Sequence, residues 1–528
     1  EREEWHCGAV NQDMGSDFMK RNSDPSAVRP ADVLKFGTIL AATLFSILGA
    51  HASEKSTVPT TRQQAVHALN RLAFGPASGD VDRVVNVGWR AWVEQQLDPK
   101  SIDDSSLERR LRKFPSLEMS MAQTYRSYRP PRALVPETSR EQRKLELEKQ
   151  RLRRGLQREL DESVFLRAAE SRRQFNEVIV NFWRNHLNID CNKSPYWANH
   201  YEVNVLRKHA FGMWEDLLMA SAKHPAMLVY LDNYHSKKGN INENYARELM
   251  ELHTLGVDNC YTQQDVGELT RVLTGWTCFW RYDDDGTEHW RFIFRANHHD
   301  SDPATVLGLR LDGNGGLTDG EMAVRYLAHH EGTARFLARK LCRHLVSDDP
   351  PEALVDHVAA VFRATRGDLT KVYRAIILSP EFMDPVFYGS KHKTPFEFVI
   401  SAVRATGACV ENPRRTLQAL EVMGQPVFKC GVPTGYSDQA EAWLDPGALV
   451  HRWNFAMRFA NDKEDGVAIP ATFHERMAGS PPVEMRRQTI DAILPGGPGT
   501  DLAKSLSKTG DPRRMIALAL GSPAFQQQ

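Results

Sequence analysis

Residues 242–258, NENYARELMELHTLGVD, place carboxylate, guanidinium and imidazole side chains at helical spacing. The residues in this stretch that could carry out catalysis are Glu243, Arg247, Glu248 and His253. Imidazole can act as a general base near neutral pH, and carboxylates can exchange protons with a substrate. The stretch is therefore the first place where a reaction could occur.

Imidazole and carboxylate groups are also ligands for divalent transition metals such as zinc or iron. We expect His186, Glu248, His253 and His299 to form a metal site if the fold brings them together. The alternative is that each is a buried group that forms hydrogen bonds between helices.

Part of the polar density has a structural explanation in helix capping. Asn240 can cap a helix with Glu243 three residues later, and Thr262 can cap a second helix with Asp265. Both pairs have the spacing of a capping box, so the sequence predicts two consecutive helices joined by a short turn.

An ion-pair ladder explains more of the same stretch. Glu243, Arg247 and Glu251 follow one another four residues apart, which stabilises a helix by a few tenths of a kcal/mol per pair. Capping and ion pairing leave His253 and Glu248 without a role, so these two residues are the ones to test.

Common catalytic and binding motifs do not occur in the chain. We find no Walker loop, no G-x-G-x-x-G, no H-E-x-x-H and no G-x-S-x-G. Residues 312–320, DGNGGLTDG, resemble a calcium loop only superficially, because Leu317 stands where that loop requires glycine. Nucleotide binding, zincin chemistry and serine-hydrolase chemistry of the familiar kinds are therefore disfavoured.

The elements that must position these side chains are mostly helices. Helical periodicity without internal proline is strongest in the charged stretch from Ser139 to Leu187. Aromatic and polar residues alternate near 277–300 around Asp-Asp-Asp-Gly, which predicts a β-hairpin. We therefore expect a mainly α-helical fold, a multi-helix globular body with a small β-hairpin insertion near 277–300.

Composition indicates a globular protein without a strong charge bias. Of the 528 residues, 41% are hydrophobic and 25% are charged, and Lys+Arg equals Asp+Glu at 67 each. This balance gives no reason to propose a nucleic-acid partner. The length exceeds that of one ordinary core. We expect an upstream extension plus signal peptide at 1–52, an N-terminal helical region at 53–138, a central helical domain at 139–400 and a C-terminal helical region at 401–528.

The N-terminal stretch has the parts of a secretory signal peptide. Lys35 precedes a short apolar run, residues 36–50, which ends in Ala50-His51-Ala52. The run is shorter than the roughly 20 residues of a membrane span. We expect a start at Met19, cleavage near Ser53, export to the periplasm or the medium, and no stable membrane span afterwards. The alternatives are an uncleaved anchor and a buried helix.

Export would allow disulfides, because exported proteins fold in oxidising compartments. Removal of Cys7 with the leader leaves six of the seven cysteines. The pairs nearest in sequence are Cys260 with Cys278 and Cys409 with Cys430. Buried free thiols are the alternative, and the absence of C-x-x-C argues against a zinc ribbon.

Several motifs follow one another along the chain. They are RLAFGP (71–76), NFWRNHL (181–187), HPAMLVYLDN (224–233), NENYARELMELHTLGVD (242–258), YTQQDV (261–266), LTGW (273–276) and PTGYSD (433–438). In this order they resemble the bacterial family filed as domain of unknown function 1800. The resemblance runs from about His67 to about Ala460 and implies a largely helical, often exported protein. Departures occur at Cys260, where glycine is usual, and at 299–306, where a glycine and a lysine usually follow the His-Asp pair.

The motifs contain further polar and aromatic residues with two possible roles. Arg71 and Arg247 could clamp a substrate or form carboxylate bridges between helices. Trp183, Trp276 and Tyr436 could stack on sugars or pack in the core.

Two functions from different classes remain. Genes of the resembled family often lie beside those of a sulfatase-like family, domain of unknown function 1501, so the resemblance implies a shared exported system. The first function, which we favour, is a scaffold or binding partner for that sulfatase-like neighbour, with the motif side chains scattered and mutually paired. The alternative is an exported metal-dependent enzyme, a hydrolase acting on cell-surface or extracellular polymer, with those side chains lining one pocket.

Overall fold

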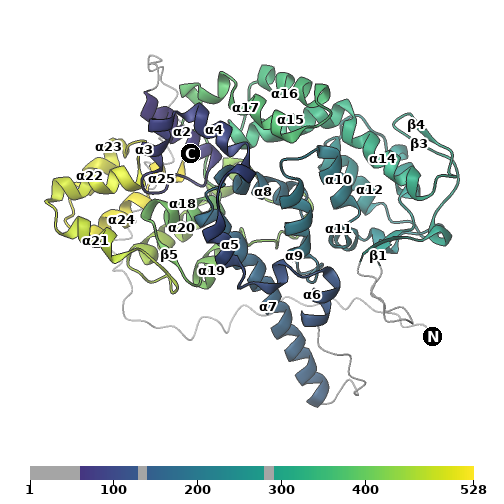
Figure 1. The fold of residues 1–528 in the computed structure, drawn as a ribbon, viewed down its shortest axis with the longest axis horizontal. Helices are drawn as coiled ribbons and strands as arrows, with labels where there is room; N and C mark the ends of the chain where they lie inside the picture. The colour runs from purple at the N-terminus through teal and green to yellow at the C-terminus, as the bar shows by residue number, and fades with distance from the viewer. Residues whose placement is uncertain (1–59, 129–139, 279–290) are drawn as a thin grey trace. The chain divides into compact units, whose positions relative to one another are not determined.

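Several helices of this protein begin where side chains satisfy their first backbone N–H groups. Reciprocal capping boxes start α2 (Thr61–Leu72), α13 (Gln263–Val272) and α18 (Pro395–Thr406). The computed structural model describes residues 60–128, 140–278 and 291–528. Within these residues the protein is mainly α-helical, as predicted (Figure 1).

The first described helices are α2 and the four helices that follow it in the chain. Helix α2 ends before Gly75, whose φ of 76° favours glycine. The buried face of α2 includes Ala65, Leu69 and Leu72. The helices that follow are α3 (Asp80–Val87), α4 (Trp89–Gln96), α5 (Ser105–Leu111) and α6 (Met121–Tyr128).

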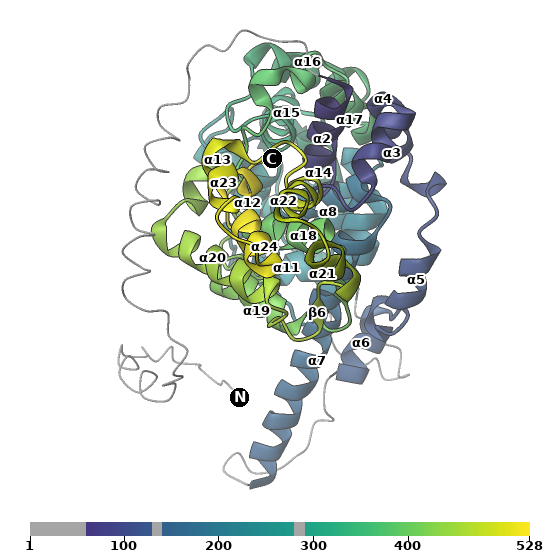
Figure 2. The ribbon, with the colours of Figure 1, turned by 90° about the vertical axis from the view of Figure 1, so that its left-hand side faces the viewer.

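The charged stretch forms two helices instead of one, α7 (Arg140–Glu170) and α8 (Gln174–His186). The interruption at 171–173 is held by contacts with distant residues, since the Ser171 hydroxyl donates to Asp104 and the Gln96 amide donates to the carbonyl of Arg172. The first half of α7 is largely exposed and extends away from the other helices (Figures 1 and 2).

Two π-helical segments interrupt the central helices. They are Glu202–Arg207, after α9 (Ala198–Tyr201), and Leu249–Thr254, after α12 (Asn244–Glu248). The amide of Leu255 donates to the carbonyl of Met250 at 2.7 Å, five residues back. Such wide turns are rare and often occur at functional sites. Helices α10 (Trp214–Ala222) and α11 (Pro225–Tyr230) lie between the two segments in the chain.

Three two-stranded antiparallel sheets accompany the described helices. Strands β1 (Trp276–Cys278) and β2 (Phe292–Phe294) pair with Trp276 opposite Phe294, which confirms the predicted hairpin pairing. Its expected turn lies at 279–290, outside the described residues. The other pairs are β3 (Ala304–Val306) with β4 (Leu309–Leu311) and β5 (Cys409–Val410) with β6 (Val467–Ala468).

The remaining helices pack as neighbours in two groups. In the first, α15 packs on α16 and α16 on α17. In the second, α20 packs on α24, which also contacts α22 (Figure 1). The bounds are α14 (Leu317–His329), α15 (Glu331–Leu345), α16 (Glu352–Ala364), α17 (Leu369–Ile377), α19 (Arg414–Val422), α20 (Pro446–Ala460), α21 (Ala471–Ala478), α22 (Pro482–Ile493), α23 (Gly499–Leu506), α24 (Pro512–Leu520) and α25 (Pro523–Gln526).

The described residues belong to one compact unit, and the divisions expected at 138/139 and 400/401 stay predictions. None of the helices in the described ranges is long and apolar enough to cross a bilayer. The signal peptide expected at the N-terminus falls in residues 1–59, outside the described ranges.

Candidate functional site

The predicted ion-pair ladder on α12 is confirmed. Arg247 lies 3.0 Å from a Glu243 carboxylate oxygen and 3.3 Å from one of Glu251, and it also donates to the Gln263 side chain. All of these side chains are partly exposed, so each contact contributes little stability. The ladder accounts for Glu243 and Arg247 as structural residues that join α12 to α13.

The cap predicted at Asn240 is wrong, whereas the cap at Thr262 is confirmed. Asn240 instead pairs with Lys237 in an isolated β-bridge, which places it before the helix. The side chain of Asn242 accepts the N–H of Asn244 at 3.0 Å and takes over the start of α12. Because residues 237–240 form a tight turn, the helix begins several residues later than predicted.

His186 and His253 lie close together in the interior. The His186 ring Nε2 donates to the backbone carbonyl of His253 at 3.1 Å, and the two ring centroids are 6.4 Å apart. Burial, followed by the charge of Lys340, lowers the pKa of His253 to about 3, and the same causes hold that of His186 well below 6.5. Both imidazoles are therefore neutral near pH 7.

Glu248 has no hydrogen-bond or ion-pair partner among the described residues, although its side chain is only partly exposed. Burial raises the pKa of its carboxyl, and the nearby charge of Glu251 raises it further. Glu248 and the imidazole of His253 are thus the members of this stretch that the structure leaves without polar partners in the described chain.

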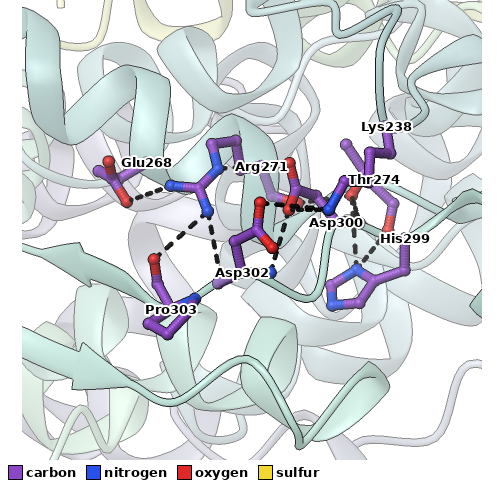
Figure 3. Close-up of polar contacts among 8 residues, drawn as sticks. All are labelled: Lys238, Glu268, Arg271, Thr274, His299, Asp300, Asp302 and Pro303. Atoms are coloured by element: carbon purple, nitrogen blue, oxygen red, sulfur yellow. Dashed lines mark hydrogen bonds and ion pairs between the residues drawn. The ribbon is translucent and has the colours of Figure 1, made fainter.

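His299 belongs to a different cluster, shown in Figure 3. Its Nδ1 donates to the backbone carbonyl of Thr274 at 3.0 Å, and the Thr274 hydroxyl accepts the N–H of Asp300 at 2.7 Å. The loop after β2 is therefore fastened to the C-terminal end of α13. The imidazole of His299 is engaged in a structural contact.

Asp300 lies between two cations in the same cluster (Figure 3). Its carboxylate oxygens are 3.4 Å from Nε of Arg271 and 3.3 Å from Nζ of Lys238. Burial raises the pKa of this carboxyl, but the N–H of Asp302 and the two cations outweigh burial, so the pKa is lowered. Asp300 is therefore a charged carboxylate that joins its own loop to α13 and to the turn at 237–240.

The four predicted metal ligands do not converge. His186 and His253 share one location, His299 contacts Thr274, and Glu248 contacts none of them through a polar bond. Across residues 60–128, 140–278 and 291–528, no group of three or more His, Cys, Asp or Glu side chains could hold a metal ion. The convergence on which the metal hypothesis depended is absent from this part of the chain.

Two further expectations are corrected. Arg71 bridges no carboxylate directly; its guanidinium donates to the carbonyls of Leu345 at 3.1 Å and of His344 at 2.6 Å, at the C-terminal end of α15. The cysteine pairs Cys260–Cys278 and Cys409–Cys430 are not bonded, since all six described cysteines are free thiols.

A polar pocket lies between α8 and the loop 425–438. One face of α8 carries Asn181, Arg184, Asn185 and, just after the helix, Asn188 at spacings of three and four residues. Phe182 of α8 and side chains from α15, from the start of α18 and from the loop complete the walls. They are Phe182, His344, Thr394, Phe396, Glu397, Gln425, Pro426, Val427, Phe428, Tyr436, Ser437 and Asp438.

Asn185 fixes the far part of the loop. Its amide donates to the carbonyl of Tyr436 at 2.7 Å and accepts the N–H of Tyr436 at the same distance. Gly435 allows this approach, because its φ is 73° and a Cβ there would lie 2.4 Å from the carbonyl oxygen of Asn185. The motifs NFWRNHL and PTGYSD are therefore partners in space.

Arg184 anchors the same face of α8 to the core. It makes two hydrogen bonds to the buried carboxylate of Glu202, at 3.1 and 2.8 Å, and Arg207 binds both Glu202 and Glu177. Burial raises the pKa of Glu202, but Arg184 and Arg207 lower it by more, so the carboxyl is ionised. This network fixes the wall of the pocket.

His344 and Asp438 form a pair at the pocket, with 3.6 Å between Nδ1 and Oδ1. Burial raises the pKa of Asp438, but His344, Lys391 and Lys340 outweigh burial and hold the pKa well below its usual range. An ionised carboxylate beside an imidazole is an arrangement that can orient a general base.

The sequence did not predict this pocket, although Tyr436 was expected either to stack on sugars or to pack in the core. Phe182 and Trp183 of the motif at 181–187 are buried. The polar members recur at 181, 184, 185 and 188 on one helical face, and this periodicity was a usable signal. The contribution of His344 and Glu397 had no comparable signal, because both come from distant helices.

A family model described as "Protein of unknown function (DUF1800)" matches residues 67–527. The chain belongs to this family. No curated protein and no solved structure matches it. The DUF1800 match covers α8, α12 and the loop 425–438, so every location described above lies inside the family region.

Proposed function

We propose that this DUF1800 protein is an exported, non-catalytic helical scaffold that binds a sulfatase-like protein of the domain of unknown function 1501 family. The observation that supports the proposal is the separation of the candidate residues. Arg247 lies in an exposed ladder, His186 bonds a backbone carbonyl, and His299 fastens a loop. A scaffold accounts for such scattered, structurally engaged side chains better than an active site does.

Co-purification tests the partner. A sulfatase-like protein of the domain of unknown function 1501 family is expressed together with the tagged mature chain. A stoichiometric complex that survives gel filtration is the expected result. Separate elution of the two proteins at micromolar concentration contradicts the proposed partnership.

Elemental analysis of the same material tests the non-catalytic part of the proposal. The scaffold requires no bound transition metal. Stoichiometric zinc or iron that is lost in His253→Ala, while the circular dichroism spectrum is unchanged, would favour the metal-dependent enzyme.

Export is tested on native material. Mass spectrometry of the protein from the periplasm or the medium is expected to find an N-terminus near Ser53. An intact leader in that material contradicts cleavage.

A hydrolase acting on cell-surface or extracellular polymer is the second candidate, and the His344–Asp438 pair favours it. Glu397 lines the same pocket, so an imidazole and two carboxylates face one space. Polysaccharide extracted from the producing cells serves as substrate, and the release of reducing ends is measured. The enzyme predicts release that falls at least 100-fold in His344→Gln, whereas the scaffold predicts no release by the unaltered protein.

A further inference from the structure

The pocket between α8 and the loop 425–438 contains polar groups with unused hydrogen-bonding capacity. Glu397 accepts the N–H of Thr394 through Oε2, and no described residue donates to its Oε1. Gln425 accepts the N–H of Phe396 through Oε1, and its amide nitrogen has no partner in the described chain. The pocket therefore offers both a fixed acceptor and a fixed donor.

Asn181 adds a second donor on the opposite wall. Its Oδ1 accepts from Arg184 at 2.9 Å, which fixes the orientation of the amide, and its nitrogen makes no hydrogen bond within the described ranges. Since the bonded half of each group is held by the protein, the free half is pre-oriented. A ligand that bonds to these groups loses little free energy to their ordering.

Nearby cationic side chains balance the charge of the carboxylates that line the pocket. Glu397 and Asp438 line it, and the buried guanidinium of Arg71 interacts with both carboxylates. Lys391 donates to the backbone carbonyl of Asp438 at 3.0 Å and also pairs with Asp348. An anionic ligand would be repelled by the two carboxylates. A cationic ligand would gain little, because nearby cations already offset the charge of these carboxylates. An uncharged polar ligand therefore fits best.

Aromatic side chains form the apolar part of the walls. Phe182, Phe396 and Tyr436 line the pocket, and the hydroxyl of Tyr436 is fixed by a 2.8 Å bond to the carbonyl of Pro426. The face of Phe428 is covered by Arg184, 5.5 Å from the ring centroid. Phe182 and Phe396 are buried, so the partly exposed ring of Tyr436 is the aromatic surface among these three that a ligand can reach. An aromatic ring beside fixed donors and acceptors suits a ligand ring that carries hydroxyls on its edge and C–H groups on its face.

We propose that this pocket binds one uncharged sugar unit of a longer carbohydrate chain. The inference goes beyond the proposed scaffold function and adds a carbohydrate ligand to it. The enclosed part of the pocket has room for only a few water molecules, so the ring lies in the mouth and its hydroxyls reach toward Glu397, Gln425 and Asn181. The rest of the carbohydrate chain extends into solvent.

An array of oligosaccharides tests the ligand class with the full mature chain. The array carries neutral glycans and, as comparison, sulfated and carboxylated glycans. Retention of neutral glycans is the expected result. Retention of none of them, or stronger retention of the anionic glycans, overturns the proposal.

Glu397→Gln tests the location. The substitution turns the free acceptor into a donor and keeps the capping box, since Gln63 occupies the same position in the box of α2. Calorimetric titration with the best neutral glycan from the array should show binding at least tenfold weaker. Asp265→Asn, in the capping box of α13 away from the pocket, is the matched control and should bind like the unaltered protein.

Unchanged affinity in Glu397→Gln overturns the assignment of the pocket. A thermal unfolding midpoint equal to that of the control excludes misfolding as the cause of a loss. Failure of co-purification with the sulfatase-like protein leaves the glycan result standing, so the two proposals fail separately.

Discussion

At the residue scale, the buried histidines make the stability of the folded state depend on pH. The ring of His253 is buried and hydrogen-bonded to no described residue, and the neighbouring His186 bonds only the backbone carbonyl of His253. Protonation would place a charge in the interior beside Lys340. The folded state therefore binds fewer protons than the unfolded chain in mildly acidic solution.

His253→Gln is expected to reduce the loss of stability in acid. The folded pKa of about 3 lies below the unfolded value of 6.5, so the penalty is absent above pH 6.5 and grows as the pH falls toward 3. Between pH 7 and 4.5 the unaltered protein should lose roughly 2–3 kcal/mol more than the variant. Urea unfolding at both pH values measures this difference, and equal losses contradict it.

Gly435→Ala is expected to destabilise the protein by roughly 2–4 kcal/mol. The alanine would have to adopt a left-handed backbone conformation, and its Cβ would lie 2.4 Å from the carbonyl oxygen of Asn185. Gly431→Ala in the same loop is the control, because nothing lies within 4 Å of its Cβ. Urea unfolding of the two variants decides, and similar stabilities would show that the loop adapts to the methyl group.

At the element scale, α8 has two faces with different tasks. Phe175, Ile179 and Trp183 are fully buried and hold the helix in the core. On the polar face, Arg184 binds the carboxylate of Glu202 and Asn185 holds the loop 425–438. The ionic contacts of the polar face are almost completely buried. Loss of one partner would leave a buried charge alone, which is costly.

Glu202→Ala should therefore lower the free energy of unfolding by roughly 3–5 kcal/mol. Arg184 and Arg207 both lose a carboxylate whose side chain is 1% exposed. Asp82→Ala removes a carboxylate that pairs with Arg62 at the surface and is the control, with little change expected. Chemical denaturation measures the free energy of unfolding of both variants. Equal losses would show that water solvates the charges that remain in the network.

Local signals in the sequence were sufficient for most elements but not for those fixed by distant residues. Thr262 with Asp265 and the ladder at Arg247 are local patterns, and both were predicted. The break between α7 and α8 depends on Ser171 meeting Asp104, more than sixty residues away. The pocket depends in the same way on helices that come together only in the folded chain.

The candidate site was predicted less well than the fold for a related reason. His253 and His299 were predicted to share a metal site because histidine is a common metal ligand. Their roles in the structure are determined by their surroundings and not by their residue type. His299 bonds Thr274, while His253 faces His186. Conversely, Asn181 and Gln425 attract little attention in a sequence, because an amide becomes part of a site only when one of its atoms remains free.

At the scale of the whole molecule, long-range contacts connect the ends of the described region. Lys393 donates to the carbonyl of Phe525 at 2.7 Å, and Arg404 donates to the carbonyl of Gly75 at 2.9 Å. Both cationic side chains are buried. The helices after 400 are therefore tied to α18 and, through it, to the start of the described chain.

We expect a single cooperative unfolding transition, because the described residues form one compact unit. Differential scanning calorimetry of the mature chain should give one peak whose van't Hoff enthalpy equals the calorimetric enthalpy. Two resolved peaks would show that the C-terminal helices unfold independently.

The wide turn at Leu249–Thr254 makes this helix unusual in its response to changes in chain length. It accommodates one residue more than a regular α-helix would over the same span, so a single deletion there could restore ordinary winding. The carbonyl of His253 would then shift relative to His186 and their bond would be lost. A deletion that would disrupt a regular α-helix would here exchange one backbone register for another.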